Sequence, residues 1–265
     1  MHAFEYHRPS STKDALALAG KKSEGRYLAG GQSLVQAMKL RLSSPSDLID
    51  LNFIKDLSGI KVSGNAVEIG AMTRHADVEG SAEVSKAIPA LAALAGMIGD
   101  RQVRHMGTIG GSLANDDPAA DYPAAVLGLG ATIITNKRKI EADKFFKGLY
   151  ETALEPGELI TSVSLPAPKR AAYMKFKNPA SRFAIVGVFV ADFGNGVRVG
   201  VTGAGPSVFR QTEMEKALTA KFAPESVAGI KVKADGLNND LHASPEYRAH
   251  LVTVMAKRAV EAALR

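Results

Sequence analysis

Two glycine motifs, Ala29-Gly30-Gly31-Gln32-Ser33 and Thr108-Ile109-Gly110-Gly111-Ser112, decide the interpretation of this chain. Two adjacent glycines let a backbone turn sharply and come close to a ligand, because neither carries a Cβ. Successive backbone N–H groups in such a turn form a concavity that suits a phosphate oxygen, and Ser33, Thr108 and Ser112 add hydroxyl donors. Two motifs of matching design predict a ligand with two phosphates held between them.

Neither motif has the lysine of a P-loop or the GxGxxG spacing of a dinucleotide-binding Rossmann turn. The phosphates would therefore be held by neutral backbone and hydroxyl donors. This arrangement favours a permanently bound diphosphate cofactor over a nucleoside triphosphate whose phosphate bonds are cut.

The composition narrows the class of protein further. The 265 residues include no cysteine, which excludes an iron–sulfur cluster held by this chain's own thiolates. The six histidines show no metal-binding spacing, so no metal site is predicted. No run approaches the ~18 apolar residues of a membrane span, and the first residues lack the apolar core of a signal peptide, so we expect a cytoplasmic protein. The net charge of +6 comes from scattered basic residues in a chain without tryptophan, which does not favour nucleic-acid binding.

The hydrophobic periodicity predicts a chain of mixed helices and strands. Asp121 is expected to cap the helix that begins at Tyr122, and Pro166 and Pro168 mark a boundary between units. The expected helices are 11–20, 34–42, 73–80, 89–98, 122–129, 212–218 and 245–263, and the expected strands are 26–29, 48–51, 60–63, 66–70, 131–135, 139–141, 158–165, 185–192 and 197–202.

The longer stretches around the motifs resemble a known family. Residues 29–34 followed by Met38-Lys39-Leu40-Arg41-Leu42, and residues 108–123, are similar to the two flavin-binding motifs of molybdenum hydroxylase flavoproteins. The resemblance is closest to the medium, FAD-binding subunits of aerobic carbon monoxide dehydrogenases and their relatives. Residues 102–104, 155–160 and 241–248 extend it over essentially the whole chain.

The resemblance implies an α+β fold in two domains. Residues 1–168 would form an FAD-binding domain of the PCMH or vanillyl-alcohol-oxidase type, with subdomains of about 1–55 and 56–168. Residues 169–265 would form a C-terminal α+β domain with a small antiparallel sheet. FAD would lie extended between the subdomains, with its diphosphate against both glycine motifs.

The family's cofactor contacts carry over by motif position. Asp121 would lie near the polar chain of the flavin, although it could also be only a helix cap. Ile160 would pack on the isoalloxazine ring, although it could also be an ordinary core residue, and the match at Lys175 could shift to Lys177. No side chain is expected to act as acid, base or nucleophile, and Asp116 and Asp117 are interpreted as loop carboxylates. The expected cofactor-binding residues are Ala29, Gly30, Gly31, Gln32, Ser33, Leu34, Thr108, Ile109, Gly110, Gly111, Ser112, Asp121, Ile160 and Lys175.

The resemblance also implies a function within a complex. A large subunit with a molybdopterin cofactor would oxidise substrate, a small subunit with [2Fe–2S] clusters would relay electrons, and this chain would pass them through FAD to an acceptor, in a dimer of heterotrimers. The substrate stays open among carbon monoxide, aldehydes, N-heterocycles and purines. Two alternatives are a single-chain FAD reductase or oxidase of the same fold and a flavin-free scaffold subunit.

Overall fold

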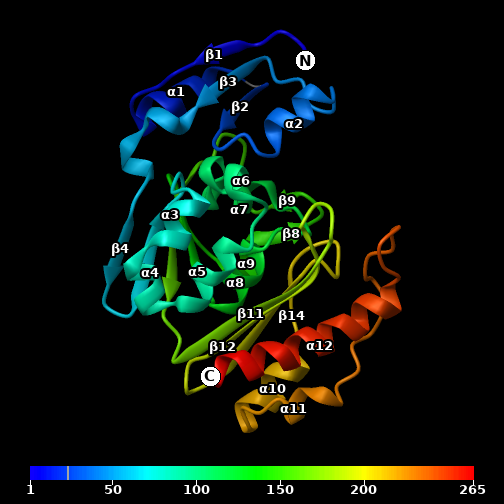
Figure 1. Ribbon diagram of the computed structural model, residues 1–265. Coiled ribbons are helices and arrows are strands. Elements are labelled where there is room, and N and C mark those ends of the chain that lie inside the picture. The colour runs from blue at the N-terminus through cyan, green and yellow to red at the C-terminus, as the bar shows by residue number, and fades with distance from the viewer. Residues whose placement is uncertain (23) are drawn as a thin grey trace.

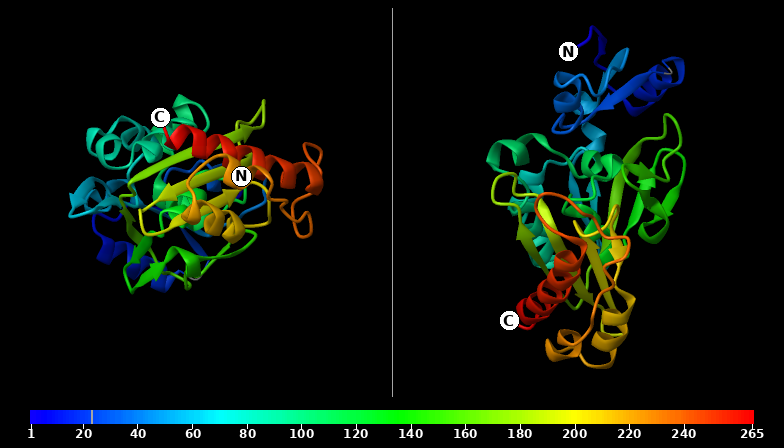
Figure 2. Two further views of the ribbon diagram at one scale, coloured as in Figure 1. Left: turned by 90° about the horizontal axis from the view of Figure 1, so that it is seen from below. Right: turned by 90° about the vertical axis from the view of Figure 1, so that its right-hand side faces the viewer.

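The computed structural model describes residues 1–22 and 24–265, which form three units that follow one another along the chain (Figure 1). Figure 2 shows the same succession from two further sides. Each unit is built on its own main sheet, so the predicted α+β class is confirmed. Within the described residues, no helix combines the length and apolar character needed to cross a membrane.

The N-terminal unit is a three-stranded parallel sheet with strand order β1-β3-β2. All four residues of β3 are buried because this strand lies in the middle. The helix α1 begins one residue after the predicted start, because Ser11 is its N-cap and the Ser11 hydroxyl accepts a hydrogen bond from the Asp14 N–H. The elements are β1 (Glu5–His7), α1 (Thr12–Lys21), β2 (Gly25–Leu28), α2 (Leu34–Lys39), β3 (Asp47–Asp50), η1 (Leu51–Phe53) and η2 (Lys55–Leu57).

The central unit is a five-stranded antiparallel sheet with strand order β4-β5-β10-β6-β7. Its middle strand, β10, pairs Val163 with Ile69 on one side and with Ile133 on the other, and all three side chains are fully buried. The elements are β4 (Ile60–Ser63), β5 (Ala66–Gly70), α3 (His75–Gly80), α4 (Ala82–Ala87), α5 (Pro89–Gly96), α6 (Arg101–Met106), α7 (Ile109–Asn115), α8 (Tyr122–Gly128), β6 (Thr132–Thr135), β7 (Lys139–Glu141), α9 (Ala142–Phe145), β8 (Phe146–Gly148), β9 (Glu151–Thr152) and β10 (Ile160–Pro166).

The C-terminal unit is a four-stranded antiparallel sheet with strand order β11-β12-β13-β14. One face is covered by the long helix α12, which packs on β11 and β12, and the other face is covered by α8 of the central unit (Figure 1). The elements are β11 (Arg170–Lys177), β12 (Ala184–Asp192), β13 (Val197–Thr202), β14 (Phe209–Arg210), α10 (Thr212–Ala220), α11 (Glu225–Ala228) and α12 (Pro245–Ala263).

Strand β12 joins the C-terminal unit to the rest of the molecule. Every residue of this strand is buried, because both of its faces are covered. Val188 and Val190 belong to the core under α12, whereas Phe189 and Ala191 belong to the core of the central unit. Successive side chains of a strand point to opposite faces, so the apolar residues of β12 contribute alternately to the two cores.

The sheet and α8 approach so closely that Gly200 on β13 cannot carry a side chain. A Cβ at Gly200 would lie 2.3 Å from the carbonyl oxygen of Ala124. We therefore expect Gly200→Ala to lower the free energy of unfolding by roughly 1–3 kcal/mol, the usual cost of overpacking. Urea unfolding followed by circular dichroism measures this.

Gly196→Ala is the matched control, because a Cβ there would have no atom within 4 Å. Equal stability losses in the two variants would contradict the close contact between α8 and the sheet.

Candidate functional site

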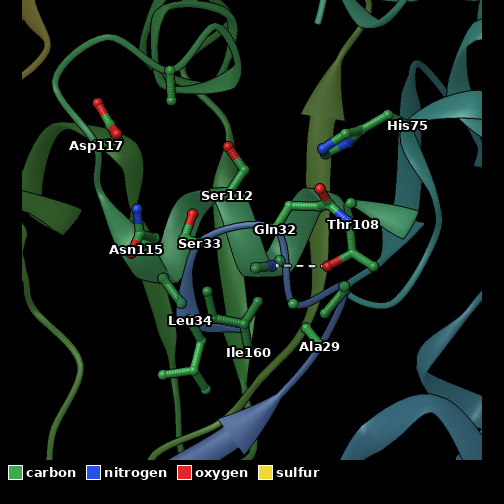
Figure 3. A pocket seen from close by; sticks show the side chains of 18 of the residues that line it. Ala29, Gln32, Ser33, Leu34, His75, Thr108, Ser112, Asn115, Asp117 and Ile160 are labelled. Carbon is green, nitrogen blue, oxygen red and sulfur yellow. Dashed lines mark hydrogen bonds between the residues drawn. The ribbon is translucent and has the colours of Figure 1, made fainter. Parts of the chain in front are cut away.

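A cavity of about 590 Å³ lies where the three units meet, and its volume is typical of a cofactor site. The N-terminal unit contributes residues 26, 27, 29–34 and 51 to its wall. The central unit contributes most of the rest, and residues 181–183 of the C-terminal unit complete it. Both glycine motifs lie on this wall (Figure 3). The structure therefore brings together two stretches that are almost eighty residues apart in the sequence.

The first motif forms a loop between β2 and α2 whose backbone donors are free. Within the described part of the chain, the N–H groups of residues 30–34 donate to no protein acceptor. Gly31 has a φ of +71°, which a residue with a side chain rarely adopts. Ser33 precedes the first residue of α2, and its hydroxyl does not cap this helix. Consecutive free N–H groups on a cavity wall are the donors that an anion-binding concavity needs, so anion binding by this loop stays a prediction.

The sequence suggests an open turn for the second motif. The structure instead shows that this motif forms the first turn of the helix α7. The Thr108 hydroxyl caps this helix by accepting from the Gly111 N–H at 3.1 Å, the bond drawn dashed in Figure 3. The N–H of Ile109 donates to Thr73 and that of Gly110 to Ala71. Most donors of this motif are thus paired within the protein, and it offers a helix start and the Ser112 hydroxyl instead.

The two motifs are locked together through backbone contacts. A Cβ on Gly30 would lie 2.1 Å from the carbonyl oxygen of Met106, so only glycine fits there. The Arg74 guanidinium donates to that same carbonyl and to the Asn52 side chain. Asn52 in turn donates to the carbonyl of Ala29 at 3.1 Å. This connected set fixes the first loop against the residues that precede the second motif.

Gly111 leaves the space between the motifs open. A Cβ there would lie 3.3 Å from the Cβ of Ala29 and 2.9 Å from the Thr108 hydroxyl. Gly110, in contrast, is needed for packing, since its Cβ would lie 2.6 Å from that of Ala71. Gly30 and Gly110 are therefore required for close packing of the backbone, whereas Gly31 and Gly111 determine the shape of the cavity.

Asp121 lies on the cavity wall, and two side chains of β11 contact its carboxylate. The Tyr173 hydroxyl donates a hydrogen bond to Oδ1 of Asp121. The Lys175 ammonium nitrogen lies 3.0 Å from the same oxygen and also donates to the Met97 carbonyl. Burial raises the pKa of the Asp121 carboxyl, and Lys175 and the Tyr173 hydrogen bond oppose this shift. The expected helix cap is wrong, because the Asp121 side chain makes no hydrogen bond to α8.

Two predicted site residues do not line the cavity. Ile109 is fully buried in the central core. The Lys175 side chain is only 2% exposed and pairs with Asp121, so it contacts the Asp121 carboxylate and does not itself line the cavity. The alternative position, Lys177, lies exposed at the end of β11.

Ile160 opens β10 and presents an apolar surface to the cavity. It is only 3% exposed and belongs to the central core. It lines the cavity together with Leu159 and with Leu34, which Figure 3 shows near it. It is a core residue, which is one of the two roles that the sequence leaves open, and its packing on the isoalloxazine ring stays a prediction. An apolar wall facing a row of polar donors suits a ligand with an aromatic ring at one end and phosphates along its length.

Several wall residues are not predicted from the sequence. The turn that follows β11 places Ser181, Arg182 and Phe183 on the wall, where Phe183 is 48% exposed. The Asn178 side chain stabilises this turn by accepting from the N–H groups of Ala180 and Ser181, and the Asn-Pro pair was the available signal. The other wall residues missed include His75, Asn115, Asp117 and Tyr150.

Asp116 is a buried carboxylate beside the cavity. It ends α7 in the left-handed conformation, is 0% exposed, and neither oxygen has a hydrogen-bond partner among the described residues. Burial, reinforced by the neighbouring Asp117 carboxylate, raises its pKa to about 7. It is thus a loop carboxylate, as expected, but in an environment that favours its neutral form.

Fold and site together define a flavoprotein of the type that holds an extended diphosphate cofactor between two subdomains. The free N–H groups of the first motif, the missing Cβ at Gly111 and the apolar surface at Ile160 fit FAD. Residues 2–168 match the FAD binding domain in molybdopterin dehydrogenase, and residues 171–263 match the CO dehydrogenase flavoprotein C-terminal domain. The chain belongs to the family of FAD-binding subunits of molybdopterin dehydrogenases.

Individual relatives are similar over nearly the full length. The carbon monoxide dehydrogenase medium chain of Hydrogenophaga pseudoflava is 37% identical over 98% of this chain and 96% of its own. The glyceraldehyde dehydrogenase medium chain of Sulfolobus acidocaldarius is 35% identical over 97% and 96%. A solved structure of the Hydrogenophaga pseudoflava carbon monoxide dehydrogenase, lacking the Mo-pyranopterin moiety of its cofactor, superposes with a TM-score of 0.91 over 99% of this chain and 98% of that chain.

Side chains at the two cavity-shaping glycines should prevent FAD binding. A valine at Gly31 would force a positive φ on a branched residue and meet Val35 at 2.9 Å, and a valine at Gly111 would enter the gap between the motifs. We expect Gly31→Val and Gly111→Val to weaken FAD binding at least about 100-fold, with smaller effects on circular dichroism.

Gly80→Val is the matched control, because Gly80 ends the helix α3 and a Cβ there would have no atom within 4 Å. Flavin absorbance of the three purified variants is the measurement. Near-normal FAD occupancy in Gly31→Val and Gly111→Val would show that the motifs are ordinary structural turns.

The Asp116 carboxyl should make stability depend on pH. Its pKa is higher in the folded chain, about 7, than its ordinary value of 3.8, so the folded form binds the proton more tightly and stability falls as the pH rises between these values. Asp116→Asn removes this dependence, and asparagine tolerates the left-handed conformation. We expect this variant to exceed the wild type by on the order of 1–2 kcal/mol at pH 8, and by less toward pH 5.

Urea unfolding of both proteins at the two pH values, in the same flavin state, measures this difference. A stability difference that stays constant with pH would contradict the buried, unpartnered state of Asp116.

Proposed function

We propose that this chain is the FAD-carrying electron-transfer subunit of a heteromeric molybdenum hydroxylase. The observation that carries the proposal is a diphosphate cradle beside an apolar wall, in a chain without a single cysteine. Such a chain can hold a flavin but has no thiolates for an iron–sulfur cluster. One-electron centres must then lie on another subunit.

When bound, FAD supplies the chemistry of accepting electrons singly or in pairs. The chain's own residues bind and orient it. The N–H groups of residues 30–34 and the Ser33 and Ser112 hydroxyls would hold the diphosphate, and Ile160 and Leu34 would position the ring. Asp121 would accept a hydrogen bond from the polar chain of the cofactor, while Tyr173 and Lys175 keep its carboxylate in place.

The proposed partners are a large molybdopterin-binding subunit and a small subunit with [2Fe–2S] clusters, in a dimer of heterotrimers. Relatives named for carbon monoxide and for glyceraldehyde are almost equally similar, at 37% and 35% identity. This supports the proposal that the large subunit, not this chain, selects the substrate. The cytoplasmic location expected from the sequence stays a prediction.

Purification of the tagged chain at its native expression level tests the proposal. We expect FAD, molybdenum and iron in one assembly, and no substrate oxidation by the flavin-loaded chain alone. A chain that oxidises an organic substrate unaided, at the rate of the native assembly, would favour a single-chain flavoenzyme. A chain that never binds flavin would favour a scaffold subunit.

A further inference from the structure

His75 is a buried, uncharged imidazole on the cavity wall, outside both glycine motifs. It opens the helix α3 and is only 5% exposed. Burial, with the nearby Arg74 and Arg104 charges, lowers its pKa to about 4, so the ring is neutral at physiological pH. A neutral imidazole carries one N–H donor and one acceptor nitrogen.

The two ring nitrogens have different surroundings. Nδ1 is buried and has no hydrogen-bond partner among the described residues. On the core side the ring packs against Tyr122, with ring centroids 5.3 Å apart and tilted by 52°. Nε2 is the nitrogen that keeps access to the cavity, and Figure 3 shows the imidazole pointing in toward Gln32 and Thr108. The single proton of the ring is therefore best placed on Nε2, where an acceptor can reach it.

The backbone places this nitrogen where the two glycine motifs meet. Arg74 and Thr108 form an isolated antiparallel bridge, and the N–H of His75 donates to the Gly107 carbonyl at 3.0 Å. A Cβ on Gly107 would lie only 2.4 Å from Nε2, so the ring occupies the space that a side chain at Gly107 would need. Gly107 also packs against Gly30, whose own Cβ would lie 2.7 Å from the Gly107 Cα.

We propose that His75 is a further cofactor-binding residue, whose Nε2–H donates a hydrogen bond to a diphosphate oxygen of FAD held between the two motifs. This inference rests on the proposed function. It gives the second motif a directed donor, which matters because the N–H groups of Ile109, Gly110 and Gly111 are already paired. The position of the His75 ring also explains why residue 107 is a glycine. Its φ of −64° is an ordinary extended conformation that any residue could adopt, so the backbone itself does not require glycine there.

Three variants separate the donor from the ring. His75→Phe keeps a ring against Tyr122 and removes the donor. His75→Gln replaces the ring but keeps an N–H near the position of Nε2. Gly107→Ala leaves the histidine in the sequence but displaces its ring from the motifs. Tyr122→Phe is the control, because it removes a buried hydroxyl that has no partner among the described residues and does not line the cavity.

Fluorescence titration of the apoprotein with FAD, combined with ³¹P NMR of the bound cofactor, is the test. A hydrogen bond to a charged oxygen is worth about a tenfold or greater change in Kd. We expect that weakening, and a shifted ³¹P resonance, in His75→Phe and Gly107→Ala, with His75→Gln and Tyr122→Phe within a few-fold of the wild type.

Tight binding by His75→Phe with an unchanged ³¹P spectrum would overturn the inference, as would equal losses in His75→Gln and His75→Phe. Failure of the wild-type chain itself to bind FAD would instead overturn the proposed function.

Discussion

The seating of Gly30 against the backbone of Met106 and Gly107 is the contact on which the rest of the site depends. No other residue fits, because a Cβ would lie 2.1 Å from the Met106 carbonyl oxygen. Arg74 and Asn52 hold this contact from both sides by hydrogen bonds to Met106 and Ala29. Two units that fold around separate cores are thereby fixed with their backbones in contact, and the residues that carry the free N–H groups line the cavity between them.

Local signals allowed much of the fold to be predicted from the sequence. Ser11 is a typical N-cap residue and caps α1 in the structure, and Gly64-Asn65 is typical of the hairpin turn found between β4 and β5. The strand β11 was not predicted, because its polar and apolar residues alternate only weakly. Pairing with β12 along its whole length stabilises it as a strand, and that contact is not visible in the local sequence.

The candidate site could likewise be predicted only in part, because some of its contacts join residues that are distant in sequence. The glycine pairs locate the cavity, but their roles depend on neighbours distant in sequence: Gly110 meets Ala71, and Gly30 meets Met106. The second motif looks like a turn in sequence and is a helix start, because Thr108 caps it. Asp121 looks like a helix cap, but Tyr173 and Lys175, more than fifty residues away, engage its carboxylate instead.

The proposed function requires that this chain recognise the diphosphate of FAD and not only its isoalloxazine ring. Titration of the flavin-free chain with FAD and with FMN, which has a single phosphate, tests this most directly. We predict one FAD per chain, released intact on denaturation, and an affinity for FMN at least about 100-fold lower. Equal affinity for FMN and FAD would contradict this claim, because the two glycine motifs would then contribute nothing to cofactor recognition.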